Sequence, residues 1–176
     1  MTRLLAVIGL LAIVVMVAAG IFFFGGFYDV GAAAGDPDWV KQGLARIRQA
    51  SIERHAKDRP PVTLDDAATV RAGARAFSQR GCVACHGGPG SDWEKFAEGL
   101  QPGPPDLKEI AHELSPQHIF WVVKNGINMT GMPSFGASEV PDQEIWTIVA
   151  FVKKLPNVSE QDYKTWTAAP TPPRPQ

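Results

Sequence analysis

Hydrophobic residues follow two patterns along this chain, one continuous and one periodic. The continuous pattern covers residues 4–24, LLAVIGLLAIVVMVAAGIFFF, a run of 21 residues without one charged side chain. As a helix rising about 1.5 Å per residue, this run is about 31 Å long, and the hydrocarbon core of a bilayer is about 30 Å thick. We therefore predict a single transmembrane helix near the N-terminus.

The periodic pattern begins after this span. In residues 38–58, Val40, Leu44 and Ile47 recur at helical spacing, and the segment ends before two consecutive prolines. Basic side chains outnumber acidic ones here. Two interpretations remain open. One is a helix near anionic headgroups with Trp39 as its interfacial anchor. The other is a solvated connector that packs on the following domain or on a neighbouring subunit.

Helical patterns continue through the rest of the chain. A helix start is predicted at residues 63–66, a further helix near residues 116–124 and a last helix over residues 142–154. Alternation of the β type is almost absent from the sequence, so the predicted fold class is all-α. The chain ends in APTPPRPQ, a composition that predicts an extended tail.

These patterns divide the chain into four parts. We expect a transmembrane anchor over residues 1–27, a partly helical periplasmic connector over 28–61, a helical domain over 62–156 and an extended Pro-rich tail over 157–176. A cleaved signal peptide is the alternative for the first part, since Arg3 supplies a basic start. The apolar run is longer than the roughly 7–15 residues of such peptides, which favours a retained anchor. Arg3 on the cytoplasmic side would place the domain on the other side of the membrane.

The charge of the chain narrows the choice of partners. The net charge is −1 and the isoelectric point is about 6.4. No overall basic field indicates nucleic-acid binding.

The two cysteines carry the clearest chemical signal. Cys82, Cys85 and His86 form the sequence C-V-A-C-H, and no other cysteine is present. A structural zinc site would need a second pair of ligands, and a thioredoxin-like pair would need a neighbouring βαβ pattern. A plain disulfide would leave the histidine unexplained. C-x-x-C-H is the attachment signature of a c-type haem, in which the thiols bond to the vinyl groups and the histidine binds the iron.

Iron held by one histidine has a sixth position, and its occupant decides the chemistry. A methionine closes that position and favours electron transfer, whereas an open position suits gas binding or peroxidase chemistry. Met132 is the preferred ligand, because Pro133 stiffens the backbone after it and Gly131 lets the chain pass close to the porphyrin. Met129 is expected to line the pocket instead. The remaining candidates are His112, His118 and His55.

With these motifs on the chain, residues 67–155 resemble class I c-type cytochromes, the monohaem helical family with a C-x-x-C-H and an axial methionine. Gly73 and Phe77 look like the family's glycine–aromatic pair on the first helix, with Phe151 preferred over Trp146 as the aromatic partner on the last. The segment N-G-I-N-M-T-G-M-P-S-F is similar to the family's axial-methionine loop.

The resemblance also implies a fold and a second contact to the histidine. About four helices would wrap around one covalently attached haem c. Residues 104–107, Pro-Pro-Asp-Leu, are similar to the family's turn in which a proline carbonyl accepts the Nδ1–H of the proximal histidine, and we assign that carbonyl to Pro105. The predicted cofactor-binding residues are Cys82, Cys85, His86, Pro105 and Met132, of which His86 and Met132 bind the iron.

The function implied is single-electron transfer by a protein that is not itself an enzyme, although it could be a subunit of one. We expect a haem subunit of a larger membrane oxidoreductase, hence a hetero-oligomer. Its partners would be a dehydrogenase, a quinol-oxidising complex or a terminal oxidase. The expected location is the bacterial inner membrane, as a single-pass protein with a periplasmic haem domain. A free-swinging tethered shuttle and a haem sensor or peroxidase are the alternatives.

Overall fold

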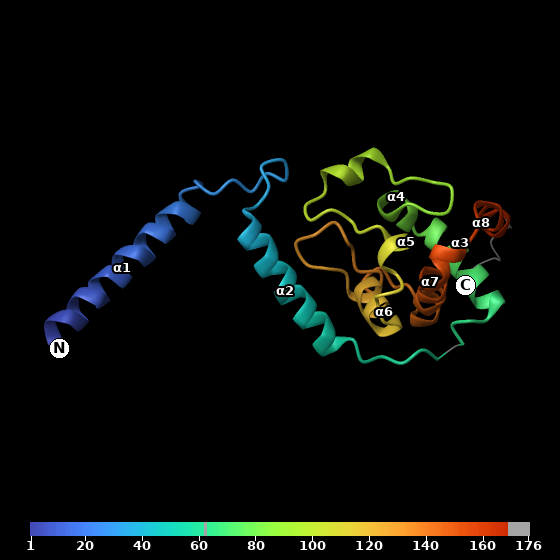
Figure 1. Ribbon diagram of the computed structural model, residues 1–176, viewed down its shortest axis with the longest axis horizontal. Helices are drawn as coiled ribbons and strands as arrows, with labels where there is room; N and C mark the ends of the chain where they lie inside the picture. Colours follow the sequence, from blue (N-terminus) through green and yellow to red (C-terminus); the bar gives the residue numbers. More distant parts are fainter. Residues whose placement is uncertain (62, 169–176) are drawn as a thin grey trace. The chain divides into compact units, whose positions relative to one another are not determined.

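The fold is built from helices joined by irregular segments (Figure 1). The computed structural model describes residues 1–61 and 63–168, and among these residues there is no strand, as the all-α prediction requires. The chain separates into two compact units, one covering Met1–Asp36 and the other beginning at Pro37.

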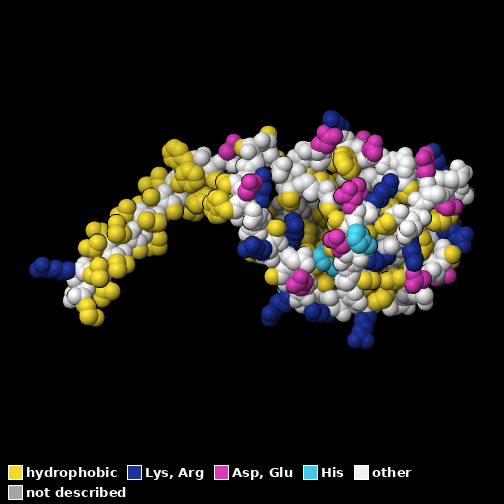
Figure 2. Space-filling model, in the orientation of Figure 1, with side chains coloured by type: hydrophobic (Ala, Val, Ile, Leu, Met, Phe, Trp, Pro, Cys, Tyr) yellow, Lys and Arg dark blue, Asp and Glu magenta, His cyan; other side chains and the backbone are white. Residues whose placement is uncertain are grey.

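The first unit is dominated by one apolar helix, α1, which runs from Thr2 to Phe24. None of its residues is buried, and Figure 2 shows it as a rod of hydrophobic side chains. Its mean hydropathy of 3.0 and its length suit a helix that crosses a membrane. The helix predicted from the continuous apolar run is therefore present, with Phe22 and Phe23 near its end in contact with Tyr28.

The second unit is organised around two helices that cross closely, α3 (Ala67–Gln79) and α7 (Asp142–Lys154). A Cβ atom at Gly73 would lie 1.9 Å from the carbonyl oxygen of Thr147, so only glycine fits at the crossing. Four residues further along α3, Phe77 packs on Phe151 with the ring centroids 5.3 Å apart, and both are buried. The expected pairing of the first and last helices is confirmed.

A third helix, α6 (Pro116–Asn125), completes this core against α7. Phe120 of α6 stacks on Trp146 of α7 with the centroids 4.1 Å apart and the rings 8° from parallel. Trp146, the second candidate for the aromatic partner of α3, thus belongs to the contact between α6 and α7. Ser115 caps the start of this helix, since its side chain accepts a hydrogen bond from the backbone N–H of His118.

The connector helix α2 (Asp38–His55) belongs to the second unit and packs on α6. Ile52 is its one buried residue, with 3% of its surface exposed, and the His55 ring stacks on Trp121 of α6 at 6.1 Å. The helix predicted over residues 38–58 is therefore present and ends slightly earlier.

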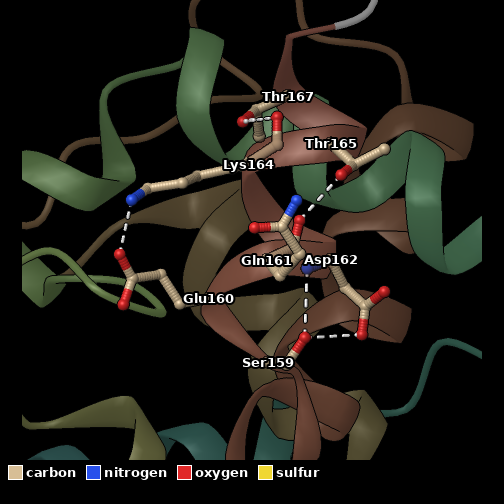
Figure 3. A network of polar contacts seen from close by, with 7 residues as sticks. All are labelled: Ser159, Glu160, Gln161, Asp162, Lys164, Thr165 and Thr167. Carbon is tan, nitrogen blue, oxygen red and sulfur yellow. Dashed lines mark hydrogen bonds and ion pairs between the residues drawn. The ribbon is translucent and has the colours of Figure 1, made fainter.

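The last described helix, α8 (Glu160–Thr167), corrects a prediction. Residues 157–176 were expected to be extended, but the Ser159 hydroxyl caps a helix by accepting from the Asp162 N–H at 3.0 Å, and Lys164 pairs with Glu160 one turn earlier (Figure 3). Tyr163 is buried and stacks on Phe151 at 5.6 Å, so the folded unit extends beyond residue 156. The segment APTPPRPQ lies outside the described residues.

Candidate functional site

One short helix, α4 (Cys82–His86), carries both cysteines and the adjacent histidine. It follows α3 directly, because Gly81 adopts a left-handed conformation with φ of 79° and turns the chain between the two helices. A single helical turn therefore presents Cys82, Cys85 and His86 together. Both cysteines are free thiols and are half-buried.

The environment of the thiols argues against a reactive cysteine pair or a zinc site. Burial raises the pKa of Cys82 to about 12, so as a free side chain it is protonated at neutral pH. Thiolate chemistry needs the opposite shift. Among the described residues, no group of three or more His, Cys, Asp or Glu side chains could hold a metal ion.

His86 is held by a backbone carbonyl. Its Nδ1 lies 3.0 Å from the carbonyl oxygen of Pro105, and a carbonyl can only accept, so Nδ1–H donates. Burial lowers the pKa of His86, opposed by this hydrogen bond and by the charge of Asp106. The ring is thereby kept neutral with Nε2 free to donate its lone pair to a metal. The hydrogen bond expected at Pro105 is present.

The segment that carries this carbonyl is fixed at both ends. Asp106 caps α5 (Leu107–Ile110) by accepting from the Lys108 N–H at 2.7 Å. At the other end, the ammonium of Lys153 from α7 donates to the carbonyl oxygens of Ala111 at 2.7 Å and Leu114 at 2.8 Å, with a third, His112, at 3.4 Å. Sequence reasoning missed Lys153, because its partners lie about 40 residues away and no local pattern marks them.

The loop between α6 and α7 holds Met132 by its backbone. Gly126, with φ of 69°, ends α6, and the chain then turns so that the Ile127 N–H donates to the Met132 carbonyl at 3.1 Å. The Met132 N–H donates to the Thr130 hydroxyl at 3.1 Å. Its side chain is partly buried and packs against the hydrophobic core.

Met129, in the same loop, is placed differently. Its side chain is 90% exposed and its φ of 58° is unusual for a residue other than glycine. The structure therefore does not bear out the expectation that Met129 lines the pocket. Gly131 makes a close approach, but to a side chain: a Cβ there would lie 2.8 Å from Leu100.

The three histidines considered as alternative ligands have other surroundings. His112 is exposed, with Nε2 3.6 Å from a carboxylate oxygen of Glu113. His118 is half-buried close to α2. The ring of His55 stacks on Trp121, and its Nδ1 lies 2.7 Å from the Ser51 carbonyl oxygen.

A cavity of about 170 Å³ lies beside Cys85. The segment between α4 and α5 supplies its other walls, among them Trp93, Ala97, Leu100 and Pro104. Most of these walls are apolar, and neither His86 nor Met132 is among them.

Taken together, the residues present fit a haem c. Two half-buried thiols spaced three positions apart suit thioether bonds, a neutral imidazole with an oriented ring suits the proximal position, and a half-buried thioether suits the sixth position. A zinc site or a thiolate redox pair would need a different donor set or different pKa values.

The comparison with known proteins indicates the same cofactor. Residues 68–152 match the model of a protein family described as cytochrome c oxidase, cbb3-type, subunit III. The match begins in α3 and ends in α7, so it includes α4 and the methionine loop and leaves out α1, α2 and α8. No curated protein and no solved structure matches the chain.

Proposed function

Residues 68–152 are a c-type cytochrome domain of class I with covalently bound haem c, and from this we propose that the chain is a membrane-anchored haem subunit that passes single electrons within a larger oxidoreductase. The domain itself performs haem-based electron transfer.

The hydrogen bond between His86 and Pro105 is the observation that carries the ligand assignment. It orients the imidazole, keeps Nε2 available and increases the basicity of the ring. In this proposal Cys82 and Cys85 form the two thioether bonds, His86 is the proximal ligand and Met132 the sixth. Haem supplies a one-electron redox couple, and the protein sets its potential through the ligands and the exclusion of water.

The complex is supported by two independent observations. The matching family is described as a subunit of an oxidase. In addition, α2 packs on α6, so only residues 25–37 separate the candidate span from the folded unit, and this short connection favours a haem domain held near the membrane over a freely swinging one. The proposed partners are membrane-bound or periplasmic redox proteins, namely a dehydrogenase, a quinol-oxidising complex or a terminal oxidase.

The membrane attachment is supported by α1, whose length and apolar composition suit a span. We place the protein in a bacterial inner membrane, single-pass, with the cytochrome domain in the periplasm. The single basic residue before the span, Arg3, supports this orientation.

Absorption spectroscopy tests the ligand assignment. The oxidised protein should show the weak far-red band that marks methionine bound to ferric haem, and the reduced protein should not bind carbon monoxide. Absence of the band together with carbon monoxide binding would overturn Met132 as a ligand and favour a sensor or peroxidase.

Purification in mild detergent tests the complex. We expect the haem to migrate with other subunits in size-exclusion chromatography and to be reduced or oxidised by their substrates. A species of 19.0 kDa plus a micelle would contradict a stable complex and favour the tethered shuttle.

A further inference from the structure

The connector helix α2 uses one face to pack on the cytochrome domain. Ala45 is half-buried and Ile52 is buried, and these residues are seven positions apart, so they lie above one another on the same side of the helix. The packing partner is α6. At the C-terminal end of α2, the His55 ring stacks on Trp121.

The apolar residues of α2 point elsewhere. Trp39 is 77% exposed, Leu44 is 56% exposed and Ile47 is 69% exposed. At about 100° per residue, Ile47 lies roughly 150° around the axis from Ala45 and Ile52, and Leu44 lies roughly 90° from them. An amphipathic helix on a soluble domain would turn its apolar face inward. Here Val40 and Ala45 are half-buried and Ile52 is buried, whereas the large apolar side chains of Trp39, Leu44 and Ile47 are exposed.

Basic side chains border this exposed face on both sides. Arg46 and Arg48 are the neighbours of Ile47 in the sequence, so they project about 100° to either side of it. Both are exposed, and neither forms an ion pair with the described residues. Arg48 lies at the edge next to α6, where its charge contributes to lowering the pKa of His118. Over residues 38–59 the six basic side chains outnumber the three acidic ones.

We propose that this face of α2, formed by Trp39, Leu44 and Ile47 with Arg46 and Arg48 at its edges, lies on the surface of an anionic lipid bilayer. An apolar face with an aromatic residue and flanking cations is the pattern of helices that lie in the membrane interface. The long arginine stems can cover apolar surface while the guanidinium groups reach the lipid phosphates.

The position of α2 in the chain favours lipid over a protein partner as the occupant. Residues 25–37 join it directly to the candidate membrane span, so α2 remains close to a bilayer whenever α1 is inserted. The inference therefore rests on the proposed anchoring by α1. Since the opposite face of α2 packs on α6, a bilayer-bound α2 would also hold the cytochrome domain near the membrane surface.

Spin-label accessibility in proteoliposomes tests this directly. The full-length haem protein carrying Ile47→Cys with a nitroxide is compared with Gln42→Cys, an exposed position about 140° away on α2. In vesicles that contain phosphatidylglycerol, the label at 47 should collide with oxygen and be shielded from a water-soluble nickel chelate. The label at 42 should show the reverse.

The lipid charge supplies the second arm. Replacing Arg46 or Arg48 by glutamine should reduce the ratio of bilayer-bound to free α2 about fivefold for each arginine. A change to phosphatidylcholine vesicles or to high salt should also reduce this ratio. Arg71→Gln, on α3, removes the same charge outside α2 and should have no effect.

Two outcomes would overturn the inference. Free access of the nickel chelate to position 47 in anionic vesicles would show that lipid does not cover this face. Shielding that persists in detergent within a purified complex, independent of lipid charge, would assign the face to a protein subunit. Failure of the anchoring itself is a separate result, because the haem protein would then be released from membranes by alkaline carbonate.

Discussion

The two methionines of the loop after α6 differ in how the backbone around them is held. Met132 has hydrogen bonds on both its N–H and its carbonyl, and its side chain reaches the core. We therefore predict that Met132→Ala abolishes the far-red methionine band, permits carbon monoxide binding and lowers the reduction potential. An axial methionine raises that potential, so its loss has the opposite sign. Visible spectroscopy and a redox titration measure these changes.

Met129→Ala is the matched control for this prediction. Met129 is in the same loop and of the same residue type, but its side chain is 90% exposed. Its replacement should leave the spectrum and the potential unchanged. If Met129→Ala behaves like the loss of a ligand and Met132→Ala does not, the two assignments must be exchanged.

Lys153 is expected to influence His86 through the turn that it holds. Its ammonium binds the backbone carbonyls at residues 111–114, and α5 connects this turn to Pro105, the acceptor for His86. In Lys153→Met we expect a weaker hydrogen bond between the His86 Nδ1–H and the Pro105 carbonyl, and hence a less basic His86 imidazole. A less basic imidazole stabilises ferric iron less. The potential should increase by on the order of 20–40 mV, the equivalent of somewhat less than one hydrogen bond.

Lys153→Arg is the control, since it keeps a cation near the same carbonyls. It should recover most of the potential. A loss of stability without any change in potential in Lys153→Met would show that Lys153 supports only the fold and not the orientation of His86.

At the scale of elements, the crossing of α3 and α7 depends on the absence of one side chain. Gly73→Ala would place a Cβ 1.9 Å from the Thr147 carbonyl oxygen and 2.9 Å from the Phe151 Cβ, so the helices must move apart. We predict a loss of about 3 kcal/mol in the free energy of unfolding, as for an overpacked core. Guanidinium denaturation followed by circular dichroism measures it.

Gly43→Ala in α2 is the appropriate comparison, because no atom lies within 4 Å of the added Cβ. In an exposed helix this change should increase stability by about 0.5–1 kcal/mol. Equal effects of the two substitutions would mean that the close contact at Gly73 does not determine the crossing.

The contact between α2 and α6 should respond to pH through His118. Burial lowers the pKa of His118 from 6.5, with Glu53 of α2 opposing and Arg48 of α2 adding to the shift. The unfolded state then binds more protons between the lowered pKa and 6.5, so stability rises with pH in that window and is lost as the pH falls through it.

We therefore expect the free energy of unfolding to decrease between pH 7.5 and pH 5.5, and to decrease less in His118→Gln. Denaturant titrations of both proteins at the two pH values provide the comparison. An identical pH dependence in the variant would assign the effect to other groups.

The helices show which parts of this fold can be predicted from the sequence. Helices α2, α3, α6 and α7 could be predicted because apolar periodicity, capping residues and prolines act locally. Helix α8 was missed because the prolines after residue 169 suggested an extended tail for the whole segment. Its start signal, Ser159 followed by Asp162, was nevertheless present.

The site divides in the same way. Cys82, Cys85 and His86 lie within five residues of one another, so their chemistry can be predicted without a structure. The hydrogen bond from His86 to the Pro105 carbonyl could be predicted only through the resemblance to a known family. Lys153 could not be predicted, since its partners lie in a distant segment. For α2 the sequence left two interpretations open, a helix near the headgroups and a connector packed on the domain, and contacts with α6 are needed to place its faces. Periodicity shows that a helix has an apolar face but not which way the tertiary structure turns it.

At the scale of the whole molecule, the boundary of the folded unit lies ahead of α2 and not at residue 62. The second unit begins at Pro37, and Ile52 and His55 of α2 contribute to its packing. A variant that starts at Pro37 behind a cleavable export signal should therefore fold and attach haem without α1.

Removing α2 as well should cost stability. A variant that starts after Arg59 loses the burial of Ile52 and exposes the surface of α6 beneath it, and burying such a side chain contributes roughly 1.5–3 kcal/mol. We predict a free energy of unfolding lower by about this amount than in the variant that starts at Pro37, with the haem spectrum unchanged because the ligands lie elsewhere. Denaturant titration of the two soluble proteins decides the point: equal stabilities would mean that α2 is only a tether, whereas the expected difference makes it part of the cytochrome domain.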